Sequence, residues 1–141
     1  MIVLDTTAVS ALMQPGLNPP VVTWLNLQPA ASLHMTTVTV MEIWVGIERL
    51  PSSARRRRLE VAFNSVVRET LRNRILDFDF GAALASATLI AERLRVGRPI
   101  DTPDSQIAGI AISRGAAIAT RNVRHFENLP VDVINPWAAS A

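Results

Sequence analysis

Three acidic residues stand where apolar runs or turns give way to helical patterns. Asp5 directly follows the apolar residues 1–4, Glu42 lies early in a helical stretch, and Asp104 comes just after a Thr-Pro step. Carboxylates that are brought together repel one another, and a hard divalent cation such as Mg²⁺ or Mn²⁺ relieves this repulsion because it prefers oxygen ligands. Such a cation can activate water and shield a phosphodiester. The three acids therefore favour metal-assisted phosphoryl chemistry.

A polar triplet, Thr120-Arg121-Asn122, follows the small apolar run 116–119. In parallel α/β sheets, ligands bind beyond the carboxyl ends of the strands, where the following helices begin. By this rule, four chain segments deliver the triplet and the three acids to one edge of the sheet. The fixed fork of donors on an arginine also suits a phosphate. We therefore predict one shared polar site at this edge.

Each acid also has a purely structural interpretation. Asp5 is well placed to cap the first helix, and Asp104 to offset the dipole of its own helix. Thr39 and Glu42 have the Thr-x-x-Glu spacing of a capping box, which needs no active site. These alternatives stay open for each residue taken singly, whereas the predicted convergence favours a common site.

Short apolar runs alternate with longer helical patterns, which predicts a three-layer α/β/α fold with a mostly parallel central sheet. The predicted strands are 1–4, 32–36, 75–78, 116–120 and 131–134. The predicted helices are 6–13, 19–27, 39–50, a stretch that restarts after 51–53 and extends to about Arg74, 80–96 and 102–114.

The composition supports one domain over residues 1–141, since 49% of the chain is hydrophobic and 18% is charged. The sequence contains neither cysteine nor lysine. This excludes a disulfide framework, a zinc ribbon, a cysteine nucleophile, Schiff-base chemistry and a P-loop. All 14 basic residues are arginine and the net charge is only +2, so overall charge is weak evidence for a nucleic-acid partner.

No stretch approaches the roughly 18 consecutive apolar residues of a membrane span. The first ten residues have no basic start and contain an acid, which is wrong for a secretory signal. Together with the missing cysteine, these features lead us to expect a cytoplasmic protein that does not contact a membrane.

Five stretches carry a resemblance: MIVLDTTAVSAL, VMEIWVGIERL, PDSQIAGIA, ATRNVRHFENL and VINPW. In this order, over nearly the whole chain, they closely resemble the PIN-domain ribonucleases of the VapC toxin type, particularly their FitB-like branch. The resemblance implies a PIN-like fold and a Mg²⁺- or Mn²⁺-dependent endoribonuclease that hydrolyses RNA phosphodiesters as the toxin of a type II toxin–antitoxin system. It also implies a homodimer, a neutralising VapB-type antitoxin, and binding of the complex to promoter DNA through that antitoxin.

The resemblance further implies roles for single residues. Asp5, Glu42 and Asp104 match the acidic positions of the family and would hold the metal. Asn122 would join these three acids in catalysis. The residues placed at the substrate are Thr120 and Arg121.

The residue at one position departs from the family pattern. Members usually carry a fourth acid where this chain has His125, between Arg124 and Phe126. His125 is therefore either a replacement for that acid or an exposed residue at a helix start. The change leaves open a second function, a catalytically weakened PIN domain that acts mainly as the partner of a DNA-binding antitoxin. A phosphoryl-accepting domain built on Asp5 is disfavoured, because such families use a lysine in the site.

Overall fold

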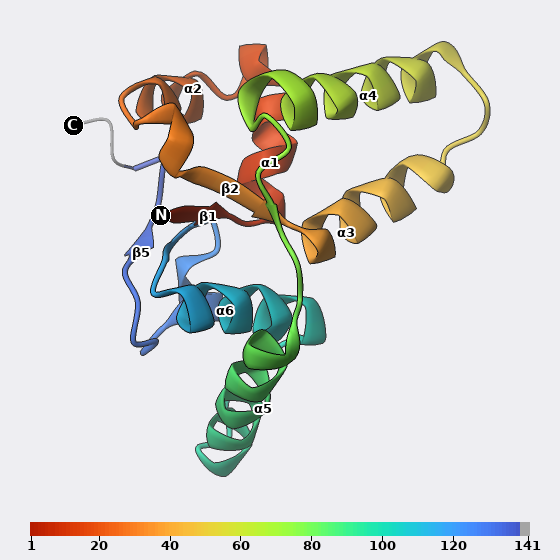
Figure 1. The fold of residues 1–141 in the computed structure, drawn as a ribbon. Helices are drawn as coiled ribbons and strands as arrows, with labels where there is room; N and C mark the ends of the chain where they lie inside the picture. Colours follow the sequence, from red (N-terminus) through yellow and green to blue (C-terminus); the bar gives the residue numbers. More distant parts are fainter. Residues whose placement is uncertain (139–141) are drawn as a thin grey trace.

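A five-stranded parallel sheet lies at the centre of the computed structural model, which describes residues 1–138. The strands are β1 (Ile2–Leu4), β2 (Leu33–Thr36), β3 (Ile75–Leu76), β4 (Ala117–Ala119) and β5 (Val133–Ile134). Their order in the sheet is β3-β2-β1-β4-β5, so the first strand of the chain lies in the middle (Figure 1). The carboxyl ends of β1, β2 and β4 consequently lie side by side.

Helices cover both faces of this sheet. They are α1 (Thr6–Met13), α2 (Pro19–Asn26), α3 (Thr37–Glu48), α4 (Ala54–Ser65), α5 (Phe80–Arg95) and α6 (Thr102–Arg114). Shorter helical turns are η1 (Pro15–Leu17), η2 (Ala30–Ser32), η3 (Val66–Thr70) and η4 (Val123–Phe126). Helices α1, α2 and α4 lie on one side of the sheet, and α5 and α6 on the other (Figure 1). The predicted three-layer α/β/α fold is confirmed, with a sheet that is parallel throughout.

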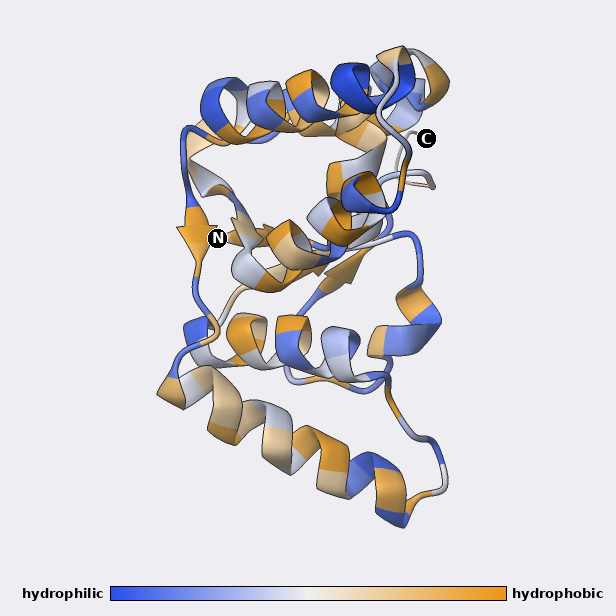
Figure 2. Ribbon diagram, turned by 90° about the vertical axis from the view of Figure 1, so that its right-hand side faces the viewer, coloured by the Kyte–Doolittle hydropathy of each residue, from blue (hydrophilic) through white to orange (hydrophobic). Residues whose placement is uncertain are grey.

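The central strand is apolar at every position because it faces two cores. Val3 packs into the core formed with α5 and α6, whereas Leu4 packs into the core formed with α1 and α2. The exposed fraction of either side chain is at most 1%. A strand covered on both faces has no polar side to show, and the strands in Figure 2 are accordingly mostly hydrophobic in colour.

Helix α6 is held close to α5 by a glycine. A Cβ on Gly109 would lie 2.5 Å from the carbonyl oxygen of Ala82 and 2.9 Å from the Cβ of Ser86, so no other residue fits this contact. At its end, α6 stops at Gly115, which has the left-handed φ of 62°. This tight packing fixes α6, whose first turn carries Asp104.

Helix α3 begins two residues earlier than predicted. The side chain of Thr36, the last residue of β2, caps the helix by accepting the N–H of Thr39 at 3.1 Å. The alternative interpretation of Thr39 and Glu42 as a capping box is therefore wrong, because Thr36 is the cap and Glu42 lies in the second turn. Glu42 is left with no capping role.

The long helix predicted up to Arg74 ends earlier. After α4 the chain continues as the π-helical turn η3 and then leaves the helical conformation. Arg72 and Asn73 take the left-handed φ values of 48° and 60°, which end a right-handed helix.

Several strands are shorter than predicted. The run 75–78 forms a strand only at Ile75–Leu76, where it pairs with Met35 and Thr36. Beyond this point the N–H of Phe78 donates to the hydroxyl of Thr37 instead of to a neighbouring strand.

Within residues 1–138, no helix is long and apolar enough to cross a bilayer.

Candidate active site

Asp5 is the most deeply buried acid at the carboxyl edge of the sheet, with 3% of its surface exposed. Its carboxylate caps α1 by accepting the N–H of Ala8 at 3.0 Å. It also accepts the hydroxyls of Thr7 at 2.6 Å and Thr120 at 2.5 Å. Burial raises the pKa of Asp5, although these hydrogen bonds act in the opposite direction. The helix-cap interpretation is confirmed, and it coexists with a place at the centre of the site.

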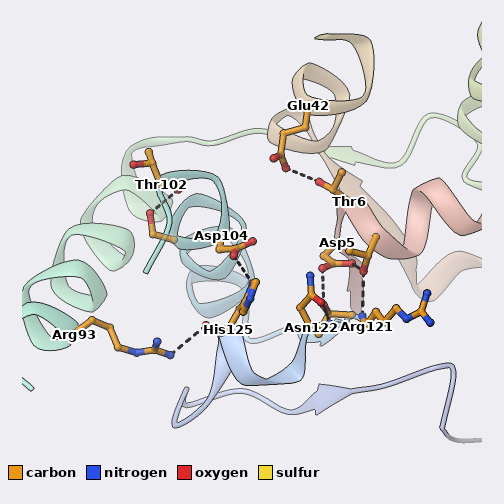
Figure 3. A network of polar contacts seen from close by, with 12 residues as sticks. Asp5, Thr6, Glu42, Arg93, Thr102, Asp104, Arg121, Asn122 and His125 are labelled. Carbon is orange, nitrogen blue, oxygen red and sulfur yellow. Dashed lines mark hydrogen bonds and ion pairs between the residues drawn. The ribbon is translucent and has the colours of Figure 1, made fainter. Parts of the chain in front are cut away.

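The predicted polar triplet is tied directly to Asp5. The hydroxyl of Thr120 donates to Asp5 and accepts the N–H of Asn122 at 2.9 Å. The N–H of Arg121 donates to the hydroxyl of Thr7 at 3.1 Å. Figure 3 shows Asn122 beside Asp5 and Arg121 extending away from the acids. The strand end thus lies where the sequence rule places it.

Glu42 reaches the site from the second turn of α3. Its Oε1 accepts the hydroxyl of Thr6 at 2.6 Å, and that same oxygen of Thr6 lies 2.9 Å from the hydroxyl of Thr39. Thr39 is fully buried and serves this contact. Helix α1 therefore orients Glu42 through Thr6.

Asp104 lies in the first turn of α6 and meets His125 of η4. The Nδ1 atom of His125 lies 2.9 Å from Oδ2 of Asp104, with 22% of the Asp104 side chain and 48% of the His125 side chain exposed. Burial raises the pKa of Asp104, His125 lowers it, and the charges of Asp101 and Asp5 raise it again. His125 is thus both exposed and part of the site.

The three predicted acids lie at the same edge of the sheet, Asp5 between β1 and α1, Glu42 on α3 and Asp104 on α6 (Figure 3). They do not form a ready-made ligand cluster. Among residues 1–138 no three His, Asp or Glu side chains are close enough to hold a metal ion together. Each acid instead accepts a hydrogen bond from its own neighbour, a hydroxyl for Asp5 and Glu42 and a ring nitrogen for Asp104.

The donor chemistry nevertheless fits a hard divalent cation. All three groups are carboxylates, and burial raises the pKa of two of them, Asp5 and Asp104, with the charge of Asp5 as a minor further cause for Asp104. A cation placed among them would relieve both the burial of charge and the repulsion. The oxygen-only set of acids suits Mg²⁺ or Mn²⁺ better than a softer metal.

A cavity of about 450 Å³ opens beside Asp104 and His125. Its wall is held by Arg93 of α5, whose guanidinium donates to the carbonyl oxygens of His125 at 3.3 Å and Glu127 at 2.7 Å. Arg93 therefore fixes the turn that presents His125. The cavity also carries Arg98.

Sequence reasoning missed three residues that orient the site: Thr6, Thr7 and Arg93. The two threonines directly follow Asp5, and that adjacency was the available signal. Arg93 carries no such signal, because its partners are backbone carbonyls far along the chain.

Known proteins are similar to this chain in sequence. The PIN domain family matches residues 2–131. The plasmid stability protein StbB of Pseudomonas syringae pv. tomato is 34% identical over 99% of this chain and 100% of that protein. The VapC ribonuclease Y4jK of Sinorhizobium fredii is also 34% identical, over 97% of this chain and 98% of that protein.

Solved structures share the fold. FitAB bound to an IR36 DNA fragment has a TM-score of 0.86 and 29% identity, over 97% of this chain and 96% of that one. DNA-bound VapBC from Salmonella typhimurium has a TM-score of 0.78 and 30% identity, over 96% and 97%. The resemblance seen in the sequence is confirmed, and the chain belongs to the PIN-domain family, within its VapC-type branch.

Proposed function

We propose that this chain is a metal-dependent endoribonuclease that serves as the toxin of a type II toxin–antitoxin pair. The observation that carries the proposal is that three separate elements place Asp5, Glu42 and Asp104 at one edge of the sheet. Relatives named as a VapC ribonuclease and a tRNA(fMet)-specific endonuclease VapC support an RNA substrate.

In this proposal, Asp5, Glu42 and Asp104 hold one Mg²⁺ or Mn²⁺ ion. When bound, such an ion activates a water molecule and offsets the charge of the phosphodiester. The raised pKa values of Asp5 and Asp104 support this assignment, since both groups gain from a nearby positive charge.

The remaining residues orient these acids and the substrate. Thr7 and Thr120 keep the carboxylate of Asp5 in place, as Thr6 does for Glu42. Asn122 offers a neutral amide beside Asp5, and we assign it to the catalytic group. We assign Arg121 to contacts with the RNA, where the guanidinium suits a phosphate. The substrate contact predicted for Thr120 is not supported, because Thr120 is fully buried and its hydroxyl is hydrogen-bonded to Asp5 and to the N–H of Asn122.

The role of His125 bears on whether the chain is an active nuclease or a catalytically weakened PIN domain. A neutral imidazole is a poor ligand for Mg²⁺ and an acceptable one for Mn²⁺. With three acids in place of four, we expect the site to bind its first ion and to hold a second weakly. Mn²⁺ should therefore support cleavage better than Mg²⁺. A chain that bound antitoxin without cleaving RNA would have the second function, that of a binding partner in transcriptional autoregulation.

The partners follow from the same assignment. Solved relatives include FitAB and VapBC assemblies bound to DNA, which supports a VapB-type antitoxin and promoter DNA bound through it.

For this chain we also propose a homodimer. Met41, Trp44 and Val45 expose 54%, 37% and 51% of their surfaces on α3, which a second subunit could bury. Light scattering should give a dimer, and a monomer at micromolar concentration would contradict it.

The proposal is tested by incubating the purified chain with RNA in the presence of Mn²⁺, Mg²⁺ or EDTA. We expect cleavage with Mn²⁺ and none with EDTA. An Asp104→Asn preparation, purified identically, reports any contaminating nuclease. If the wild-type chain cleaves equally in EDTA, or if both preparations cleave equally, the proposal fails.

A further inference from the structure

Arg121 stacks on an aromatic ring beside the acidic site. Its guanidinium carbon lies 5.2 Å from the centroid of the Trp137 ring, within the range of a cation–π contact. Its backbone is fixed by the hydroxyl of Thr7. Within residues 1–138, the guanidinium makes neither a hydrogen bond nor an ion pair. The ring therefore holds the group while its N–H donors remain available to a ligand.

Trp137 is itself fastened to the body of the domain. Its Nε1–H donates to Oδ1 of Asn18 at 3.3 Å, and its backbone N–H donates to Oδ1 of Asn135 at 3.0 Å. Asn18 in turn donates to the carbonyl oxygen of Gln14, at the end of α1, at 3.0 Å. A chain of contacts thus runs from α1 through Asn18 and Trp137 to Arg121.

A groove of about 340 Å³ is lined by Arg121 and Trp137 together with the hydroxyl residues Thr6, Thr7 and Ser10. No acid lines this groove, but the hydroxyls of Thr6 and Thr7 donate to Glu42 and Asp5. Arg121 is the one charged side chain in the groove lining. A hydroxyl-lined groove with one cation suits the ribose and phosphate of a nucleotide.

The cavity on the other side of the acids is less suited to a phosphate. It carries the acids Glu92, Asp101 and Glu127 as well as arginines. Arg93 is engaged with carbonyl oxygens, and Arg98 lies 3.5 Å from Glu127. With Asp104 counted, four acids face three arginines in this lining, the third being Arg124, so the charge of the cavity does not favour a phosphate.

We propose that Arg121 binds a backbone phosphate of the RNA next to the scissile one, and that Trp137 and Asn18 are positioning residues for it. The inference rests on the proposed function and names a substrate contact within it. A planar guanidinium with one face on an indole presents its fork of donors outward, which matches two phosphate oxygens. Because the stack restricts the side chain before RNA arrives, less conformational freedom is lost on binding.

The test measures binding of a short fluorescein-labelled single-stranded RNA in EDTA at several salt concentrations. Arg121→Ala should weaken binding roughly tenfold, because a hydrogen-bonded charge is lost. It should also lower the slope of log affinity against log salt by about 0.7, the value for one phosphate contact on a single strand. Arg72→Ala, at an exposed turn on the opposite edge of the sheet, is the matched control and should change neither quantity.

The positioning role is tested by coupling. Trp137→Ala should weaken binding less than Arg121→Ala, and the double variant should bind no more weakly than Arg121→Ala alone. Trp137→Phe keeps a ring and should keep most of the affinity. Asn18→Ala should give a smaller loss. If Trp137→Ala proves unfolded by circular dichroism, Trp137→Phe and Arg121→Gln carry the test.

Two results overturn the inference: unchanged affinity and salt slope in Arg121→Ala, or additive losses from Arg121→Ala and Trp137→Ala. A wild-type chain that does not bind the RNA also overturns it. Cleavage in Mn²⁺ is scored separately, so the two proposals can fail separately. A chain that cleaves RNA with no role for Arg121 loses only this inference, and one that binds through Arg121 without cleaving loses only the nuclease function.

Discussion

The inner and outer parts of the acidic site are built differently. Asp5, the inner acid, is buried and receives two hydroxyls and one backbone N–H. Glu42 and Asp104, the outer acids, are half-buried and each has one side-chain partner, Thr6 or His125. The inner acid therefore stabilises the fold as well as belonging to the site, whereas we expect the outer acids to contribute to function and little to stability.

The largest expected effect separates function from folding at the outer part. Asp104→Asn keeps the shape and removes a charge, so RNA cleavage should fall by on the order of 10²-fold or more, as when other electrostatic stabilisers are lost. Stability should not fall, because burial disfavours the charge of Asp104 in the metal-free chain. Rates are measured with Mn²⁺ at saturating RNA. Asp132→Asn, an exposed acid before β5, is the control, and near-wild-type cleavage by Asp104→Asn would remove Asp104 from the site.

The inner part should respond in stability as well. Asp5→Ala removes the cap of α1, which should lower the free energy of unfolding by about 1–2 kcal/mol. It should also abolish cleavage. Chemical denaturation in EDTA compares it with Asp104→Ala, for which we expect a smaller loss. Equal losses in both variants would mean that the inner and outer acids do not differ in the way described.

His125 sharpens the comparison within the outer part. If the missing fourth acid limits metal binding, His125→Asp should raise Mg²⁺-supported cleavage several-fold and reduce the preference for Mn²⁺. If His125 instead contacts the scissile phosphate as a cation, the same change should lower the rate. Initial rates with each metal decide between these two accounts. Unchanged rates and an unchanged metal preference would make His125 a surface residue in functional terms.

The smallest effect concerns pH and the metal-free chain. The pKa of Asp104 is raised above 3.8 in the folded state, so the folded chain binds this proton more tightly than the unfolded chain. The resulting stability is present below about pH 3.8 and is lost as the pH rises through the raised pKa. The free energy of unfolding, measured in EDTA, should therefore increase for Asp104→Asn relative to the wild type as the pH rises from about 3.8 through the raised pKa of Asp104. A difference that stays constant with pH contradicts the assignment.

Much of the fold could be predicted because the sheet is covered on both faces. That arrangement forces continuous apolar runs such as 1–4, and such runs are easy to separate from helical patterns. The start of α3 was missed because two threonine caps compete there. Thr36 caps the helix in place of Thr39 because Thr36 already lies at the end of a buried strand.

The places of Asp5 and Asp104 in the fold could be predicted for a similar reason, since they lie at strand and helix ends, whereas their role as metal ligands stays a prediction. Their partners could not be predicted. Thr6 meets Glu42 across 36 positions of sequence, and Arg93 meets the carbonyl of His125 across 32. The contact of Thr6 with Glu42 depends on how α1 packs against α3, which the sequence does not show. The contact of Arg93 leaves no pattern because every residue has a carbonyl acceptor.

The central claim is that Asp5, Glu42 and Asp104 share one divalent ion. Calorimetric titration of Mn²⁺ into the metal-free chain tests it without RNA. We predict a single binding event per chain for the wild type and for Asp132→Asn, and its loss in Asp5→Asn and in Asp104→Asn. If the wild type binds no Mn²⁺, or if Asp104→Asn binds it with unchanged affinity, the claim is contradicted.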